Sequence, residues 1–303
     1  MRAFFIIFVS IVLEAMPFIL LGSFVSGLIQ VFVSESWIEH IMPKKTWIGF
    51  IIAGLLGVVF PVCECAIVPI TRRLVKKGVP IGMATTFMLS VPIVNPVVLL
   101  STYYAFSDKT YMVFARGIFG FLAAITIGVL ITVGQEKGKT ILRQRKLNHA
   151  THDHAHCACG CHTSGDSRKS NPIMSLLEHT SGEFLNISQY LVFGAFLSSL
   201  FQIFVDKGAI SGIATNPYLS VGFMMGLAFI LSICSEVDAF IARTFISQFT
   251  SGSILAFLIF GPMLDIKNTM MLLGSFKTKF VLKLILYITL VSYLIGLIAN
   301  LCI

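Results

Sequence analysis

Long apolar runs, interrupted by very few charged side chains, recur along the whole chain. Roughly 20 consecutive apolar residues are what an α-helix needs to cross the hydrocarbon core of a membrane. Of the 303 residues, 56% are hydrophobic and 12% are charged, about half the charged fraction of an ordinary soluble domain. The sequence therefore predicts an all-α polytopic membrane protein, because the runs are too many for a signal peptide plus one anchor.

Eight transmembrane helices account best for these runs. The expected spans cover 3–33, 46–70, 79–106, 111–134, 184–205, 218–240, 253–276 and 280–302. Ten segments remain compatible with the sequence if the second and sixth runs each hold a span and a re-entrant piece. The chain then divides into a first transmembrane repeat (1–134), a cytoplasmic basic and His/Cys-rich flexible loop (135–182) and a second transmembrane repeat (183–303).

The net charge of +8 is concentrated in short connectors between the apolar runs. Arg72, Arg73, Lys76 and Lys77 occupy one connector, and the loop that follows the fourth run is also basic. This is the positive-inside distribution of cytoplasmic loops, which contact anionic lipid headgroups. The charge therefore indicates membrane topology and argues against a nucleic-acid partner.

The two halves of the chain resemble one another at a nearly constant offset. The matched pairs, 170 to 172 residues apart, are Gly22 with Gly194, Cys63 with Cys234, Pro92 with Pro262, and Asn95 with Asp265. Such weak duplication is typical of secondary transporters, whose sites form where discontinuous helices of two repeats meet. Four spans per half would make the repeat parallel, which the sequence favours, and an odd number would make it inverted.

Two stretches place thiols and carboxylates inside apolar runs, where such groups are costly and usually functional. The first stretch contains Cys63, Glu64 and Cys65 between Pro61 and Pro69, and these prolines are expected to break the helix. In irregular backbone, residues two apart point the same way, so both thiols could reach one soft ligand. Small buried cysteines beside a misplaced span boundary are the simpler interpretation.

The second stretch contains Cys234, Glu236 and Asp238 and aligns with the first. Its cysteine is expected to complete a solute-binding set with Cys63 and Cys65. Glu64, Glu236 and Asp238 are expected to couple protons or to complete the coordination. The simpler alternative is a helix end at the membrane surface with both carboxylates in water, and Arg243 fits that alternative because it aligns with Arg72.

Further polar residues lie at proline-rich points of two other runs. Pro92, Pro96 and Pro262 are expected to mark helix breaks, and the solute-binding candidates beside them are Asn95, Asp265 and Asn268. An ordinary proline kink is the alternative interpretation. Glu14 lies near the middle of the first run and is a candidate for proton coupling, or else a buried group hydrogen-bonded to a neighbouring helix.

The polar loop has the composition of a metal chelator. The potential ligands are His149, His152, His154, His156, Cys157, Cys159, Cys161 and His162. Zn²⁺ or Cu(I) suits these side chains, although no fixed finger spacing is present. The loop is therefore expected to acquire or sense metal, with incidental low complexity as the alternative, and the predicted function requires no cofactor.

These motifs resemble the bacterial predicted-permease family that includes the ArsP-like organoarsenical efflux permeases. The matching stretches are 63–69, 77–80, 92–96, 234–240 and 260–268. The resemblance implies a multi-pass permease of the bacterial cytoplasmic membrane, with Cys63, Cys65 and Cys234 as thiol ligands. The family usually has a small polar residue where this chain has Glu64, and a carboxylate there shifts the site toward cations.

The sequence thus predicts a secondary-active permease, not an enzyme, that exports a thiophilic solute such as a trivalent organoarsenical or a soft metal ion. A Zn- or Cu-type metal permease fed by the His/Cys loop is one alternative. A membrane thiol oxidoreductase and a non-transporting membrane subunit of a complex are two others. The expected partners are membrane lipid, the small solute and, in the last case, another membrane protein.

Overall fold

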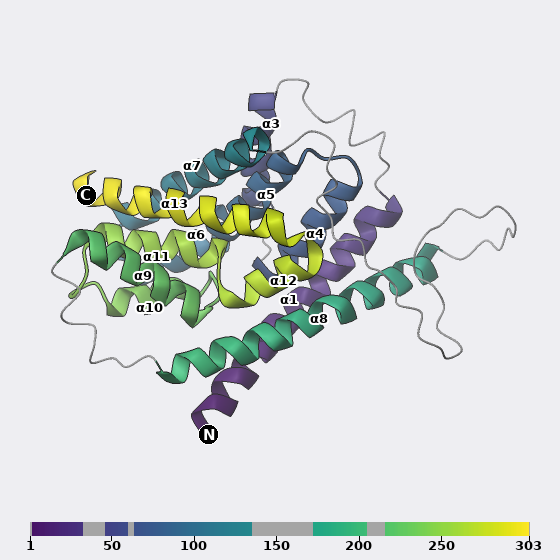
Figure 1. Ribbon diagram of the computed structural model, residues 1–303, viewed down its shortest axis with the longest axis horizontal. Helices are drawn as coiled ribbons and strands as arrows, with labels where there is room; N and C mark the ends of the chain where they lie inside the picture. The colour runs from purple at the N-terminus through teal and green to yellow at the C-terminus, as the bar shows by residue number, and fades with distance from the viewer. Residues whose placement is uncertain (1, 33–45, 60–63, 135–171, 205–215, 303) are drawn as a thin grey trace, which may run out of the picture.

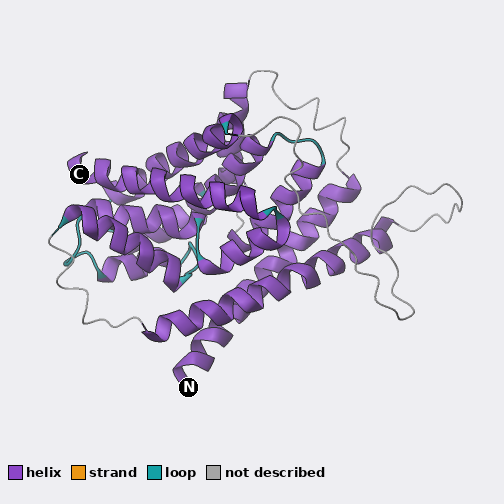
Figure 2. Cartoon of the chain, in the orientation of Figure 1, coloured by secondary structure: helices purple, strands orange, loops and turns teal. Residues whose placement is uncertain are grey.

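The computed structural model describes residues 2–32, 46–59, 64–134, 172–204 and 216–302, and these form helices joined by short turns without any β-strand (Figures 1 and 2). The prediction of an all-α fold is confirmed. The helices are α1 (Arg2–Phe32), α3 (Thr46–Val59), α4 (Glu64–Lys76), α5 (Ile81–Val94), α6 (Pro96–Ala105), α7 (Tyr111–Val133), α8 (Pro172–Phe204), α9 (Pro217–Leu231), α10 (Asp238–Thr244), α11 (Ser251–Met263), α12 (Ile266–Ser275) and α13 (Thr278–Cys302). Helix α8 begins inside the segment expected to be a loop.

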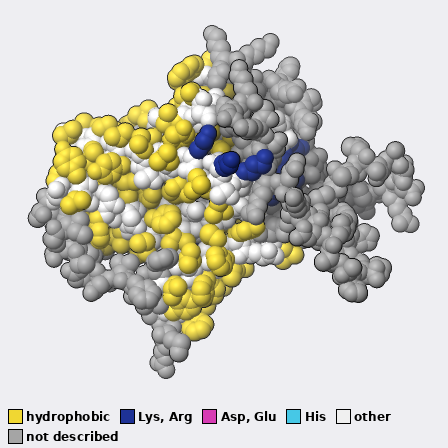
Figure 3. Space-filling view, in the orientation of Figure 1, with side chains coloured by type: hydrophobic (Ala, Val, Ile, Leu, Met, Phe, Trp, Pro, Cys, Tyr) yellow, Lys and Arg dark blue, Asp and Glu magenta, His cyan; other side chains and the backbone are white. Residues whose placement is uncertain are grey.

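Five stretches within the described residues are long and apolar enough to cross a membrane. They are Phe4–Val25, Ile81–Ala105, Tyr111–Val133, Ser251–Ser275 and Thr278–Cys302. The apolar stretches Trp47–Val58 in α3 and Pro217–Leu231 in α9 are shorter. Hydrophobic side chains cover most of the described face in Figure 3, and Lys and Arg side chains lie toward one end of it. This surface is that of a multi-pass membrane protein.

Helices α3 and α4 form a re-entrant hairpin instead of one continuous span. A Cβ placed on Gly82, at the start of α5, would lie 3.2 Å from the ring of Phe50, and one on Gly57 would lie 3.0 Å from Ser90 Oγ. Helix α3 therefore runs parallel to α5. Helix α4 must run back, because only residues 77–80 separate its end from the start of α5. The 14 residues of α3 rise about 21 Å, which puts the end of α3 well inside the membrane.

The second half repeats this arrangement with α9 and α10. Ser220 near the start of α9 hydrogen-bonds Ser253 near the start of α11. Further along the two helices, a Cβ on Gly261 would lie 3.5 Å from Ala228. Helix α9 is therefore parallel to α11, and α10 returns to the start of α11 through residues 245–250. The second and sixth expected spans are thus hairpins that enter the membrane and turn back.

The two halves run in opposite senses. Lys283, near the start of α13, donates a 3.0 Å hydrogen bond to the carbonyl of Gly134 at the end of α7, so these two helices are antiparallel. Helix α7 is the last helix of the first half, and α13 is the last helix of the second half. The two halves are therefore inverted relative to each other, where the sequence favoured a parallel arrangement.

Contacts between the two hairpins and the crossing helices follow from this inversion. Arg243 at the end of α10 binds Asp108 in the turn between α6 and α7, and it lies 5.7 Å from the centre of the Phe106 ring. The guanidinium lowers the pKa of the Asp108 carboxyl through this hydrogen bond. Arg243 therefore lies at the opposite end of the molecule from Arg72, although the two residues align in sequence.

The crossing helices α5–α6 and α11–α12 are each interrupted once, at Asn95 and at Leu264–Asp265. Asn95 is extended (ψ 129°), as expected for a residue that precedes proline, and its side chain accepts the N–H of Val97. Pro96 begins α6 as predicted. Pro69, Pro92 and Pro262 were expected at breaks but lie inside helices. A proline removes only one hydrogen bond, and neighbouring helices support the backbone there.

Pairs of glycines set the closest helix contacts in both halves. A Cβ on Gly128 of α7 would lie 2.7 Å from the carbonyl oxygen of Gly82 in α5. In the second half, a Cβ on Gly296 of α13 would lie 3.3 Å from the carbonyl oxygen of Gly252 in α11. Small residues allow backbones to approach closely, which is the main source of helix packing energy inside a membrane.

We expect Gly128→Val to lower the free energy of unfolding by about 1–3 kcal/mol, because the new side chain overlaps the α5 backbone. Thermal unfolding of the purified chain in detergent measures the effect. Gly226→Val is the matched control, since no atom lies within 4 Å of its Cβ position. Equal melting temperatures for the two variants would contradict this helix contact.

Candidate functional site

The start of α4 and the turn between α9 and α10 meet the break between α11 and α12 in the buried interior. Glu64 begins α4, Ser235 lies in the tip between α9 and α10, and Lys267 lies in the first turn of α12. Lys267 Nζ is 3.2 Å from Glu64 Oε1, and the Ser235 hydroxyl donates a 3.2 Å hydrogen bond to Glu64 Oε2. Both oxygens of the Glu64 carboxylate are thereby occupied by donors from the other half of the chain.

A second ion pair lies beside the first. Arg116 of α7 contacts both carboxylate oxygens of Asp238 at 2.9 and 2.6 Å, and Asp238 begins α10. The guanidinium also donates to Thr102 Oγ1 at 2.8 Å and to the Ser235 carbonyl at 3.3 Å. Ser235 therefore connects the two ion pairs, through its hydroxyl on one side and its backbone on the other.

Five ionisable residues make up this buried charge cluster: Glu64, Arg116, Asp238, Asp265 and Lys267. Each exposes 3% or less of its surface. Removing one member of a buried pair leaves an uncompensated charge, so each member depends on its partner. With all groups ionised, three negative and two positive charges leave the cluster with a net charge of −1.

Local backbone geometry supports the break between α11 and α12. Ser232 ends α9 in the left-handed region (φ 47°), which is uncommon for a residue other than glycine. This places its hydroxyl 3.1 Å from the Ile266 N–H, which it accepts. Asp265 accepts the Asn268 N–H through Oδ1. Two backbone donors at the start of α12 therefore have side-chain acceptors inside the membrane.

Two of the three expected thiols lie beside the cluster. Cys65 is the second residue of α4 and Cys234 lies in the tip of the other hairpin; they are 2% and 5% exposed, and neither forms a disulfide. Both sulfur atoms interact electrostatically with the Lys267 ammonium and with each other. Cys63 lies outside the described residues. The two halves of the chain thus contribute one thiol each to one location.

The remaining candidates from the sequence are distributed as follows. Asn95 caps α6, and no described contact joins it to the cluster. Glu236 is half-buried, and its backbone carbonyl accepts the Ser101 hydroxyl. The side chain of Glu14 is outside the described set. Pro61 and the expected metal ligands His149, His152, His154, His156, Cys157, Cys159, Cys161 and His162 also lie outside the described residues.

Arg116 is the member of the buried charge cluster that the sequence interpretation missed. It is a lone cation five residues into the apolar run that forms α7, and it is fully buried. The rule that a charge inside a membrane span marks a functional site applies to it as directly as to Glu64. Its partner could not be named from the sequence, because Asp238 is 122 residues away.

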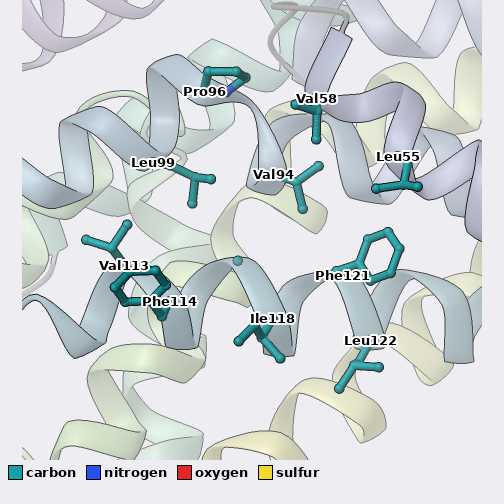
Figure 4. A pocket seen from close by; sticks show the side chains of 11 residues that line it. Leu55, Val58, Val94, Pro96, Leu99, Val113, Phe114, Ile118, Phe121 and Leu122 are labelled. Carbon is teal, nitrogen blue, oxygen red and sulfur yellow. The ribbon is translucent and has the colours of Figure 1, made fainter.

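Two apolar grooves open on the membrane-facing surface but do not reach the charge cluster. One, with a volume of about 460 Å³, lies between α3, α5, α6 and α7 and is lined by residues such as Val94, Leu99 and Phe121 (Figure 4). The other, of about 340 Å³, lies between α9, α11 and α13. Within the described ranges, no three His, Cys, Asp or Glu side chains lie close enough together to hold a metal ion.

Comparison with known proteins assigns the chain to a family. Residues 1–301 match the ArsP_1 family, which is described as "Predicted permease". The chain belongs to this family. A family of predicted permeases agrees with the multi-pass architecture and with a location in a bacterial cell membrane. No solved structure gives a significant match.

Two curated relatives match nearly all of the chain, and a third matches part of it. The UPF0718 protein YcgR of Bacillus subtilis is 44% identical over 285 residues, which cover 94% of this chain and 92% of the relative. The "Putative two-component membrane permease complex subunit" of Streptococcus mutans is 39% identical, with coverage of 92% and 89%. The UPF0718 protein MJ0584 of Methanocaldococcus jannaschii is 29% identical over 118 residues, covering 38% of this chain and 32% of the relative.

We expect Arg116→Met to reduce the free energy of unfolding by about 3–5 kcal/mol, because Asp238 would remain charged, buried and unpaired. Adding Asp238→Leu to Arg116→Met should restore most of the loss, since both charges are then absent. Chemical unfolding of the single and double variants measures the coupling. Equal instability of the single and the double variant would contradict the pairing.

Proposed function

We propose that this chain is a secondary-active permease that exports a thiophilic solute through the centre of the inverted repeat. The observation that supports it is the position of Cys65 and Cys234, one from each half, beside the Glu64–Lys267 ion pair. Transporters with inverted repeats bind their substrates near the middle of the membrane, where discontinuous helices from both repeats meet. The two hairpin tips and the start of α12 are such elements.

Because the two thiols come from different halves, binding of a solute by both of them depends on the relative position of the halves. A solute bound by Cys65 and Cys234 together holds both hairpin tips in one arrangement. When the halves move against each other, the distance between the sulfurs changes and the solute is released. The hairpins enter the membrane from opposite ends of the molecule, so this movement can open the site to one side at a time.

The charge beside the thiols favours a neutral solute over a divalent cation. Lys267 and Glu64 both act on Cys234, and because they form an ion pair, their opposite charges offset each other and add little attraction for Zn²⁺ or Cd²⁺. A trivalent organoarsenical with two hydroxyl groups reacts with two thiols to form two As–S bonds and two water molecules. This exchange changes no net charge, so it suits a buried site. The solute class we propose is therefore a trivalent organoarsenical.

A second membrane protein as partner also forms part of this proposal. The name of the Streptococcus mutans relative describes a subunit of a two-component membrane permease complex, and that relative aligns with 92% of this chain. We propose that this chain likewise acts together with a different membrane protein. The metal-acquiring role of the His/Cys loop remains a prediction from its composition.

We expect Cys65→Ser and Cys234→Ser each to weaken binding of phenylarsine oxide at least about tenfold, because each removes one of two As–S bonds. Arsenic bound to the purified full chain in lipid nanodiscs is the measurement. Growth of cells that express each variant at toxic arsenical concentrations reports export.

Cys302→Ser is the matched control, since Cys302 is exposed near the end of α13 and far along the chain from the hairpin tips. Unchanged arsenic binding in both hairpin-tip variants would refute the role of these thiols. Binding of Cd²⁺ but not of the arsenical, lost in the same variants, would favour the metal-permease alternative.

For the partner, we expect the full chain, purified gently from its native membrane, to retain one other integral membrane protein in a fixed ratio. Native mass spectrometry of the purified sample gives the composition. A sample that contains only copies of this chain, while still exporting the arsenical in vesicles, would show that no second component is needed.

A further inference from the structure

The buried charge cluster contains one carboxylate more than it has cations. Glu64 is paired with Lys267, and Asp238 is paired with Arg116. Asp265 is the third carboxylate, and its cationic neighbour Lys267 is already hydrogen-bonded to Glu64. An uncompensated charge at membrane depth is costly, so the cluster favours uptake of one positive charge.

The hydrogen bonds indicate which carboxylate oxygen is available to bind that positive charge. Both oxygens of Glu64 and both oxygens of Asp238 accept hydrogen bonds. Asp265 accepts one through Oδ1, but its Oδ2 has no hydrogen-bond partner, because Lys267 Nζ lies 3.7 Å away. Asp265 therefore has the one carboxylate oxygen of the cluster that lacks a donor.

A second unpaired oxygen lies in the same helical turn. Asn268 is 5% exposed and donates through its amide to the Met263 carbonyl, while its Oδ1 has no partner. The backbone N–H of Asn268 is the group that Asp265 caps, so the two side chains are neighbours at the start of α12. Two buried acceptors without a donor are unfavourable, and one additional hydrogen between them would satisfy both.

We propose that Asp265 binds the coupling proton of this permease at Oδ2. The protonated carboxyl donates its hydrogen to Asn268 Oδ1, and Lys267 stays on Glu64. When the proton leaves, Asp265 becomes a carboxylate and Lys267 is drawn toward it, which weakens the Glu64–Lys267 contact between the two halves. Described groups that interact electrostatically with Asp265 are Lys267 and Glu64. This inference rests on the proposed transport function. Asp265 takes the role of proton carrier that the sequence led us to expect for Glu64 and Asp238.

The test is infrared difference spectroscopy of the full chain in lipid nanodiscs, between mildly alkaline and mildly acidic buffer, without any solute. We expect the carbonyl band of a protonated, buried carboxylic acid to appear in the wild-type protein and to be absent in Asp265→Asn. The amide of Asp265→Asn keeps the cap and supplies a donor for Asn268, so this variant should fold and should lose the pH dependence of its melting temperature.

Asp108→Asn is the control, because Asp108 is an exposed aspartate in the turn between α6 and α7, outside the buried charge cluster; this variant should keep the band. Cys65→Ser and Cys234→Ser should also keep it, so failure of arsenical binding and failure of this inference are distinguishable. Should Asp265→Asn not fold, wild-type protein made with isotope-labelled aspartate decides the matter, since the label must shift the band.

Three results would overturn the inference. One is a band that persists in Asp265→Asn, and another is a band that aspartate labelling leaves in place. The third is the absence of any band, together with a melting temperature that rises with Na⁺ at constant pH, which would make the site a metal-cation site.

Discussion

A helix that ends inside a membrane leaves backbone N–H and C=O groups that neither water nor lipid can satisfy. This chain contains several such ends, at two hairpin tips and at two interrupted crossings. The structure resolves them by bringing the ends together, so that side chains of neighbouring elements bind the free backbone groups. The Ser232 hydroxyl at the second hairpin serves the start of α12, and Asp265 caps the same helix.

The buried charge cluster depends on the same arrangement. Glu64 on the first hairpin binds Lys267 and Ser235, which both belong to the second half of the chain. Arg116 of the first half binds Asp238 of the second. Every ion pair between Glu64, Lys267, Arg116 and Asp238 therefore crosses the boundary between the inverted halves. In the transport mechanism that we propose, a movement of one half against the other exchanges these partners and thereby links proton binding to solute release.

Residue types and their spacing were sufficient to locate most of the site. Glu64, Cys65, Cys234 and Asp265 were chosen because charged or thiol groups are rare in apolar segments, and all four lie near one another. The path of the chain was harder to predict. Hydropathy shows that a segment is apolar but not in which direction the chain runs through the membrane. The 14-residue helix α3, after which the chain turns back, therefore resembles the first half of a continuous span. The same ambiguity led the sequence to favour a parallel repeat.

The sequence by itself determined the class of protein, the repeat and the residues worth testing, because apolar length and misplaced polar groups are properties of the chain alone. The tertiary structure decided which charges pair. Arg116 and Asp238 are 122 residues apart and Glu64 and Lys267 are 203 residues apart, and only the folding of two inverted halves brings them within contact distance. It also decided that Asp265 is the carboxylate without a full partner, because that depends on which oxygens the surrounding donors reach.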